Sequence, residues 1–413
     1  MPASAEARAW RVAGAGLVGL AVAVGLGRFA FTPLLPMMLQ DGLLDLRQAS
    51  WLASSNYLGY LLGALACALQ PWLWRQLPPA LGQAPRLSFA RLIRLGLLAT
   101  VVLTLAMALP WPWAWPGLRL AAGLASALVF VYGSGWSLSQ LTRLGKPQWG
   151  GLIYMGPGLG IVISGLAGGA MVGREWSSPA AWLCMGVLAV LGTALIWTVL
   201  GEVASHEERL AVAAPAAEAT AAGHGLSEQA LLVLGYGLAG FGYIISATFL
   251  PVIARTALPG SVWLDLFWPL FGLGVAVGAL LSTRLPSALD KRGLLVASYL
   301  VQALGIGVGL LYPSVPGFVV GSVLLGLPFS AISFFAMQEA RRIKGGTAAS
   351  FMGLLTATYG LGQVLGPLLV AELLRHREAA PGFDLALLIA AVGLGLGAII
   401  FAWMMKQYPM RPA

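Results

Sequence analysis

Residues 25–36 read Gly-Leu-Gly-Arg-Phe-Ala-Phe-Thr-Pro-Leu-Leu-Pro and lie inside an apolar run from Val12 to Leu39. A run of this length is sufficient to cross a bilayer as a helix. Arg28 stands near the middle of the run, where a charge is costly in lipid, so we expect its side chain to face protein or a water-filled cavity. Charged residues at this depth are typical of substrate and ion pathways, which makes Arg28 the first candidate for a ligand contact.

The same pattern occurs a second time in the chain. Residues 240–251 repeat the two glycines and the final proline of this stretch at a constant offset of 215 residues, with Tyr243 in the position of Arg28. Glycines of two further helices repeat as well: Gly59 and Gly63 as Gly274 and Gly278 at offset 215, and Gly151, Gly158 and Gly160 as Gly353, Gly360 and Gly362 at offset 202. The loop at residues 74–91 is longer than its counterpart at residues 285–290, which accounts for the difference between the offsets. The pattern predicts two similar halves, in which small residues four apart let helices pack closely.

Composition restricts the class of protein. Of the 413 residues, 59% are hydrophobic and 9% are charged, and the mean hydropathy is +0.84. A soluble domain carries about 25% charged residues, so this chain is a polytopic membrane protein. The net charge of +9 does not indicate a nucleic-acid partner, because the basic residues are scattered through short loops. Cys67 and Cys184 lie inside apolar runs and are interpreted as small apolar residues, without a disulfide or a metal.

Apolar runs bounded by Pro, Gly and charges predict twelve transmembrane helices and no strands. They cover residues 11–39, 50–73, 93–110, 116–140, 149–172, 180–200, 228–254, 262–283, 293–312, 315–338, 347–373 and 384–405. We therefore predict an all-α integral membrane protein built from two parallel six-helix pseudo-repeats. Residues 1–201 form the first bundle, residues 202–227 a cytoplasmic linker and residues 228–413 the second bundle.

The distribution of basic residues predicts the orientation. Of the 24 Lys and Arg residues, 17 fall on the side of both termini, five on the opposite side, and Arg28 and Arg119 in the membrane. Basic residues are enriched in cytoplasmic loops, so we expect both termini in the cytoplasm. The expected location is a bacterial inner membrane.

Twelve helices in two parallel halves resemble the major facilitator superfamily. Residues 151–160 are similar to the Gly-Pro motif of its fifth helix, which is most typical of its antiporters, and Arg119 with Gly123 resembles its Arg-x-x-x-Gly motif. Residues 25–36 and 51–60 resemble the YbfB/YjiJ family of that superfamily. The superfamily's usual Gly-x-x-x-Asp-Arg-x-Gly-Arg-Arg loop is missing at residues 71–80, and the second half retains only Arg284 and residues 290–293 of it.

The resemblance implies a cavity lined by helices one, four, seven and ten, with helices two, five, eight and eleven at the boundary between the halves. It points to aromatic and polar residues of these helices as the substrate site: Arg28, Phe31, Asn56, Tyr57, Tyr60, Tyr132, Tyr154, Tyr243, Ser246, Phe334, Tyr359 and Gln363. Packing or interfacial roles remain the alternative for each tyrosine. Gating or coupling candidates are Arg119, Gly156, Pro157, Asp265 and Glu339.

Arg28 has two interpretations from the sequence. An ideal helix would place Gly25, Arg28 and Phe31 on one face, and no carboxylate lies at a comparable depth, so an unpaired cation there favours an anionic or strongly accepting ligand. The alternative is an arginine that braces neighbouring helices through carbonyls or Asn56. Arg119 is expected either in the cavity or snorkelling to the outer surface.

Proton coupling usually needs a buried acid, and the candidates Asp265, Glu339 and Glu372 lie near helix ends, where a solvated or ion-paired surface acid is the stronger interpretation. We predict a monomeric secondary transporter that moves a small organic solute by alternating access, with proton-coupled efflux favoured by the Gly-Pro motif. The alternatives are an uptake symporter for an anionic metabolite and a membrane-embedded enzyme or channel. No motif indicates catalysis, a cofactor, a metal or a nucleic-acid partner.

Overall fold

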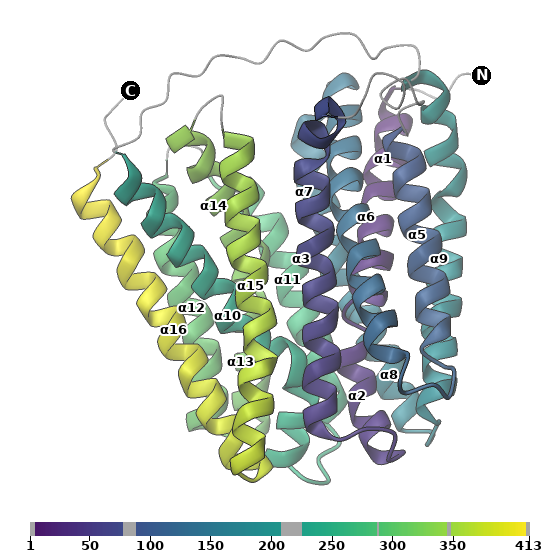
Figure 1. The fold of residues 1–413 in the computed structure, drawn as a ribbon, viewed down its shortest axis with the longest axis vertical. Coiled ribbons are helices and arrows are strands. Elements are labelled where there is room, and N and C mark those ends of the chain that lie inside the picture. The colour runs from purple at the N-terminus through teal and green to yellow at the C-terminus, as the bar shows by residue number, and fades with distance from the viewer. Residues whose placement is uncertain (1–4, 77–87, 208–224, 287–288, 345–347, 410–413) are drawn as a thin grey trace.

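A computed structural model describes residues 5–76, 88–207, 225–286, 289–344 and 348–409. These residues form twelve helical segments that are long and apolar enough to cross a membrane, and no strand occurs among them. The predicted all-helical membrane fold is confirmed. Figure 1 shows the segments running roughly side by side, with both termini at one end of the molecule.

The first half comprises α1 to α9 and the second half α10 to α16. The elements of the first half are α1 (Ala5–Leu20), η1 (Ala21–Leu26), α2 (Phe31–Gln40), α3 (Leu46–Gln76), α5 (Phe89–Ala106), α6 (Trp115–Arg143), η2 (Pro147–Trp149), α7 (Gly150–Ile153), α8 (Gly156–Val172) and α9 (Ser178–Glu207). Those of the second half are α10 (Leu226–Ala257), η3 (Leu264–Leu266), α11 (Phe267–Arg284), α12 (Lys291–Leu311), α13 (Val315–Gly326), α14 (Pro328–Lys344), α15 (Ala348–His376) and α16 (Ala379–Gln407). Helix α9 continues into the segment predicted as a linker, and residues 208–224 of that linker lie outside the described chain.

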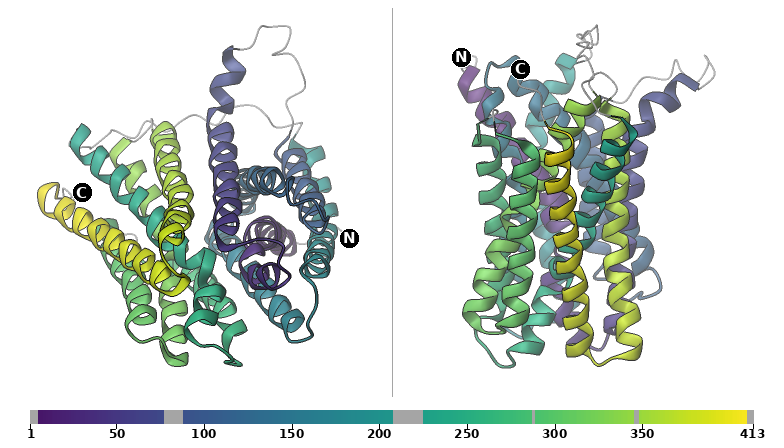
Figure 2. Two further views of the ribbon diagram at one scale, coloured as in Figure 1. Left: turned by 60° about the horizontal axis from the view of Figure 1, so that its bottom comes forward. Right: turned by 90° about the vertical axis from the view of Figure 1, so that its left-hand side faces the viewer.

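The two halves meet along two pairs of helices, which we call the seams. Helix α3 packs against α15 on one side and α8 packs against α11 on the other, and Figure 2 shows the two groups of helices separated along this boundary. Under the offsets of 215 and 202 residues, these two seams are equivalent to each other. Thr32 donates a hydrogen bond of 3.0 Å to the carbonyl of Ala247, its own equivalent 215 residues later. Equivalent positions therefore face each other at the centre, as two parallel repeats require.

Glycines let the helices within each half approach closely, as the repeat predicts. A side chain at Gly59 would collide with the backbone of Leu120 on α6, and one at Gly278 would collide with the backbone of Leu327 between α13 and α14. Gly25 packs in the same way against Gly160, and Gly240 packs against the backbone of Tyr359. The predicted packing role of Gly59 and Gly278 is confirmed.

The first transmembrane segment is interrupted, and its prediction as one continuous helix was wrong. Residues 21–26 are wound as a π-helix, residues 27–30 form a turn, and α2 begins at Phe31. Gly25 and Gly27 are weak helix formers, and Pro33 has no N–H to donate to the carbonyl of Phe29. The amide of Thr32 donates to that carbonyl instead, at 3.1 Å. Arg28 lies in the turn, so the helical face predicted for it does not exist.

The fifth segment is interrupted at a similar place. Helix α7 ends at Ile153, and α8 begins at Gly156 with Pro157 at its first turn, where a missing N–H costs nothing. Gly156 and Gly160 of α8 pack against the backbone of Leu17 and Ala21 in the first segment. The two interruptions therefore lie against each other in the core of the first half.

Candidate functional site

Arg28 lies between the halves and contacts both of them. Only 4% of its surface is exposed, and its Nη2 donates a hydrogen bond of 2.9 Å to Oε1 of Gln363 on α15. The amide nitrogen of Gln363 in turn donates to the hydroxyl of Tyr243 on α10. Tyr243 is the repeat equivalent of Arg28, so Gln363 links the two positions that differ between the halves.

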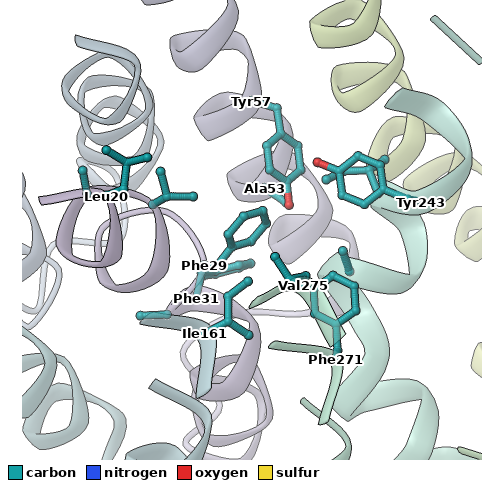
Figure 3. Close-up of a cluster of buried hydrophobic side chains, with 14 of the residues drawn as sticks. Leu20, Phe29, Phe31, Ala53, Tyr57, Ile161, Tyr243, Phe271 and Val275 are labelled. Atoms are coloured by element: carbon teal, nitrogen blue, oxygen red, sulfur yellow. The ribbon is translucent and has the colours of Figure 1, made fainter. Parts of the chain in front are cut away.

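Aromatic rings surround the guanidinium group of Arg28. Its central carbon lies 4.1 Å from the ring centre of Tyr60, 5.0 Å from that of Tyr57 and 5.1 Å from that of Phe29. Each contact is a cation–π interaction, which is strongest where water is excluded. Figure 3 shows Tyr57 of α3 and Tyr243 of α10 facing each other across the boundary, above Phe29.

A stack of tyrosines continues the aromatic lining into the second half. The ring centres of Tyr243 and Tyr359 lie 5.8 Å apart, and those of Tyr359 and Tyr236 lie 4.6 Å apart, with nearly parallel planes. The hydroxyl of Tyr236 donates to Ser333 at 2.9 Å. In the first half, Tyr60 contacts Phe130, and Phe130 contacts Tyr154. Tyr60, Tyr154 and Tyr359 are partly exposed.

Arg119 supports the interrupted first segment. It is 2% exposed, and its guanidinium donates to the carbonyl of Arg28 at 2.8 Å and to that of Gly27 at 3.3 Å. The interruption frees these carbonyls from helical bonds, and an unpaired carbonyl inside a membrane is costly. Asn56 donates to the backbone carbonyl of Arg119 at 2.8 Å, and Phe31 lies beneath the guanidinium at 5.0 Å. The snorkelling alternative for Arg119 was therefore wrong.

The predicted site residues fall into three groups. Those in one connected network around Arg28 are Tyr57, Tyr60, Tyr243, Tyr359 and Gln363. Those that reach the network through an intermediary are Phe31 and Asn56, by way of Arg119, and Tyr154, by way of Phe130. Those placed elsewhere are Tyr132, Ser246 and Phe334.

Each of the three outlying residues has a local role. The hydroxyl of Tyr132 donates to Gln70 at 2.8 Å inside the first half. Ser246 lines a cavity of about 30 Å³ within the second half, together with Ser322 and Ile306. Phe334 packs against its neighbour Phe335.

Several residues of the network were missing from the prediction. Tyr236 lies seven residues before Tyr243, on the same face of α10, and that spacing was visible in the sequence. Phe29 could not be found, because a continuous helix would turn it away from Arg28. Thr248, whose hydroxyl lies 2.8 Å from that of Tyr57, belongs to the other half and carried no signal.

The predicted gating acids are paired with arginines. Asp265 forms an ion pair of 2.5 Å with Arg255, and Gly169 of the first half packs against its side chain. Glu339 is completely buried, which contradicts its interpretation as a surface acid. It forms ion pairs with Arg292 at 2.5 Å and with Arg342 at 2.8 Å.

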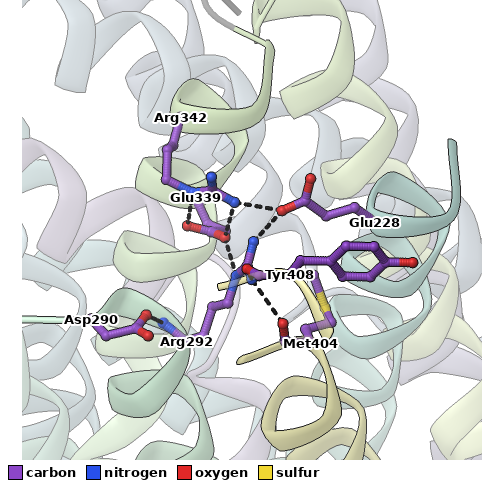
Figure 4. Close-up of polar contacts among 7 residues, drawn as sticks. All are labelled: Glu228, Asp290, Arg292, Glu339, Arg342, Met404 and Tyr408. Atoms are coloured by element: carbon purple, nitrogen blue, oxygen red, sulfur yellow. Dashed lines mark hydrogen bonds and ion pairs between the residues drawn. The ribbon is translucent and has the colours of Figure 1, made fainter. Parts of the chain in front are cut away.

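Glu339 belongs to a buried charge cluster near the end of the molecule that holds the termini (Figure 4). Arg292 also pairs with Glu228, and its Nη1 donates to the carbonyls of Met404 at 2.9 Å and Tyr408 at 2.5 Å. Two acids and two arginines thus join the ends of α10, α12, α14 and α16. All four helices belong to the second half, so the cluster stabilises that half and does not bridge the seams.

The electrostatic character of the central site differs from that of the charge cluster. Arg28 and Arg119 are adjacent and buried, and no ion pair joins either of them to an acid in the described chain. The Nε atom of Arg28 has no hydrogen-bond partner there. No group of three His, Cys, Asp or Glu side chains that could hold a metal occurs among the described residues. The site therefore offers two positive charges, aromatic faces and a few neutral polar groups.

Comparisons with known proteins agree with this architecture. The family model described as "Uncharacterised MFS-type transporter YbfB" matches residues 20–402. Two crystal structures of the nucleoside transporter NupG, one of them of a point mutant, share the fold. Their TM-scores are 0.70 and 0.66 at 14% sequence identity, the matches cover 96% and 98% of this chain, and each covers 100% of the NupG chain.

No curated protein matches the chain. The family model spans nearly all of the described residues, both seams and the central site. The chain therefore belongs to the YbfB family of major facilitator transporters, and it is a multi-pass membrane transport protein for a small molecule.

Proposed function

We propose that this transporter moves a small organic anion by alternating access, with the anionic group bound at Arg28. The observation that carries the proposal is a pair of buried arginines, Arg28 and Arg119, which have no acidic partner in the described chain; the Arg119 guanidinium donates to the backbone carbonyl of Arg28. A buried cation without a counter-ion is unfavourable, and an anionic ligand would supply the missing charge.

The geometry favours Arg28 over Arg119 as the contact. Arg119 uses two of its donors on backbone carbonyls, whereas Arg28 makes one hydrogen bond, to a neutral amide. Gln363 therefore occupies the place of an acceptor that a carboxylate or phosphate would fill more strongly. A ligand oxygen would replace Oε1 of Gln363 at the guanidinium group.

The aromatic lining suggests the body of the solute. Tyr60 is partly exposed, and its ring already lies against a flat cationic group, while Tyr359 is partly exposed beside Tyr243. Flat rings with a few polar groups suit a small, planar or ring-containing molecule.

The contacts across the boundary are compatible with rocking of one half against the other. Within the part of the chain that the structure describes, the side-chain hydrogen bonds that cross it are those of Arg28 to Gln363, Thr32 to Ala247, Ser54 to Val364, and Tyr57 to Thr248, four in number. Three of these bonds join neutral groups and the fourth is charge-assisted, so each can be exchanged for a bond to water or a ligand. We propose that residues 1–201 and 228–413 are the moving units, that both termini are cytoplasmic and that the protein works as a monomer.

For direction we propose efflux, on the resemblance of residues 151–160 to the Gly-Pro motif. The buried carboxylates of the described spans, Glu228 and Glu339, are both held by arginines near one end of the bundle. We assign the coupling proton to neither of them, because protonation would leave buried arginines unpaired.

A neutral, nucleoside-like solute is the second candidate. The observation in its favour is the stack of Tyr236, Tyr359 and Tyr243, which offers a flat aromatic surface for a heterocycle. Such a solute would leave the charges of Arg28 and Arg119 uncompensated, which is why we prefer an anion.

The deciding experiment is a solute-stabilisation screen on the purified protein, since a ligand raises the melting temperature by mass action. The panel contains aromatic and aliphatic carboxylates, organic phosphates and nucleosides. The matched control for Arg28→Gln is Arg94→Gln, because Arg94 also stacks on an aromatic ring, Trp197, and donates to a carbonyl, at 2.7 Å. We expect acids to stabilise the wild type and Arg94→Gln but not Arg28→Gln, and to be transported in proteoliposomes. Stabilisation by nucleosides alone, equal in all three proteins, would overturn the anion proposal.

A further inference from the structure

A surface groove lies between α3 and α15, at the end of the molecule opposite the termini. Its volume is about 360 Å³, and it is lined by Arg47, Trp51, Leu368, Ala371, Glu372 and Arg375. Helix α3 belongs to the first half and α15 to the second, so the groove lies over a seam. None of its residues takes part in the central site.

Two apolar stripes run from this groove along the outside of the seam. On α3 the exposed face continues from Trp51 through Leu58, Leu62 and Leu69, at spacings that keep the residues on one side of the helix. On α15 it is formed by Leu354, Leu361 and Leu365, each about half exposed. From Arg47 to Leu69 a helix rises about 33 Å, which matches the hydrocarbon thickness of a bilayer. The stripes therefore face lipid over the depth of the membrane.

The charges gather at the groove end of these stripes. Arg47 is exposed, and no ion pair or hydrogen bond of its guanidinium occurs in the described chain. Arg375 pairs with Glu372 at 3.1 Å, and Glu372 also lies 3.3 Å from His376. The groove thus carries two arginines and one acid, with Trp51 at the level where an indole ring is favoured at a membrane interface.

We propose that this groove binds the headgroup of an anionic phospholipid, whose acyl chains lie along the stripes of α3 and α15. Along the membrane normal, the order of the protein groups matches the order of the parts of a lipid. The guanidinium groups match the phosphate, the indole matches the interface, and the leucines match the acyl chains. A second copy of the chain is a poorer occupant, because it would have to bury the charged rim of the groove.

The lipid would contact both halves at once. Ser54 on α3 and Val364 on α15 are already joined by a hydrogen bond of 3.0 Å one to two turns deeper. A phosphate held by Arg47 and Arg375 would add a second tie across the same seam, nearer the surface. This site does not depend on the identity of the solute bound at Arg28.

Native mass spectrometry of the detergent-solubilised protein, titrated with dioleoylphosphatidylglycerol, tests the proposal. One basic residue near an anionic lipid accounts for about a fivefold change in affinity, so Arg47→Gln should bind the lipid about fivefold more weakly. Glu372→Gln removes the competing acid and should bind it more tightly by a similar factor. Arg174→Gln, at an exposed arginine of the same end but outside the groove, is the control and should bind like the wild type.

Three outcomes would overturn the proposal. Equal binding of dioleoylphosphatidylcholine would show that no anionic headgroup is needed. An equal loss of lipid affinity in Arg47→Gln and Arg174→Gln would show that the groove is not the binding site. Displacement of the lipid by inorganic phosphate at matching concentrations would assign the arginines to a free anion. Arg28→Gln should bind phosphatidylglycerol like the wild type, so failure at this groove and failure of the solute proposal are distinguishable.

Discussion

Replacing Arg28 by glutamine removes a positive charge from the boundary between the halves while keeping a polar, neutral side chain that is two bonds shorter. The substitution loses the hydrogen bond of 2.9 Å to Gln363 and the cation–π contact of 4.1 Å with Tyr60. The first half keeps the bonds from Arg119 to the carbonyls of Gly27 and residue 28, because both acceptors are backbone atoms.

The stability change contains terms of opposite sign. A hydrogen bond from a charged donor contributes about 1.5–3 kcal/mol, and a desolvated cation–π contact adds roughly 2 kcal/mol. Against this, removing a buried cation without a counter-ion recovers a desolvation cost of several kcal/mol. We therefore expect the free energy of unfolding to change by no more than about 2 kcal/mol, in either direction.

The effect on ligand affinity has only one sign. Two charge-assisted hydrogen bonds to a carboxylate contribute about 3 kcal/mol together, and each 1.4 kcal/mol is a factor of about ten, so the affinity should fall about a hundredfold. Arg28→Lys keeps the charge but loses the planar pair of donors, and we expect a loss of about tenfold.

Melting temperature and ligand affinity, measured on the same preparations, separate the two roles of Arg28. A ligand-contacting arginine gives a large loss of affinity with a small change in melting temperature. A bracing arginine gives the reverse, a lower melting temperature with unchanged affinity in the folded fraction. The second pattern, with Arg94→Gln behaving like the wild type, would refute the assignment of Arg28 to the solute.

Three further predictions concern other parts of the molecule. Arg119→Lys keeps the charge, but lysine can reach only one of the two carbonyls freed by the interruption at residues 27–30. The free energy of unfolding should therefore fall by about 1–3 kcal/mol, measured as a lower melting temperature, and an unchanged value would show that the carbonyls find other donors. Glu339→Gln breaks a fully buried ion-pair cluster and should lower the free energy of unfolding by about 3–5 kcal/mol. Glu372→Gln, at an exposed pair, should leave the melting temperature nearly unchanged, and equal effects of the two substitutions would contradict the structural role of the cluster. A reporter that is active only in the cytoplasm should be active when fused to the C-terminus, and an inactive but stably expressed fusion would contradict the predicted orientation.

The sequence predicted the architecture because membrane helices leave a direct record in composition. Apolar length gives the number of spans, and the repeated glycines at offsets of 215 and 202 residues give the two halves. The helix boundaries differ from the prediction by a few residues, since side chains at helix ends carry little apolar signal; α3, for example, extends from Leu46 to Gln76 instead of 50–73.

The central site was only partly predictable. Charge, aromatic character and helix order are visible in the sequence, and six residues selected on that basis lie together in the structure: Arg28, Tyr57, Tyr60, Tyr243, Tyr359 and Gln363. Their role in binding a solute stays a prediction. Ser246 and Tyr132 lie apart from this group, because neither helix order nor residue type tells which side of a helix faces the other half. The inward position of Arg119 depends on carbonyls that become free only when the first segment is interrupted, and this was not anticipated.

The interruption explains why a single arginine can serve both halves. In a continuous helix, the backbone carbonyls of Gly27 and Arg28 would be used internally, and Arg119 would have no acceptors at that depth. With the turn at residues 27–30, Arg119 fixes the backbone of Arg28 to the first half, through bonds of 2.8 and 3.3 Å. Among the described residues, the side chain of Arg28 is then held by Gln363 and by aromatic rings alone, so its guanidinium group is the part that a ligand can bind. A solute that replaces Gln363 at this guanidinium group would release a contact between the halves at the same moment as it binds. Under this proposal, binding and movement would be connected at one hydrogen bond, so Arg28→Gln should lower both the ligand affinity and the transport rate.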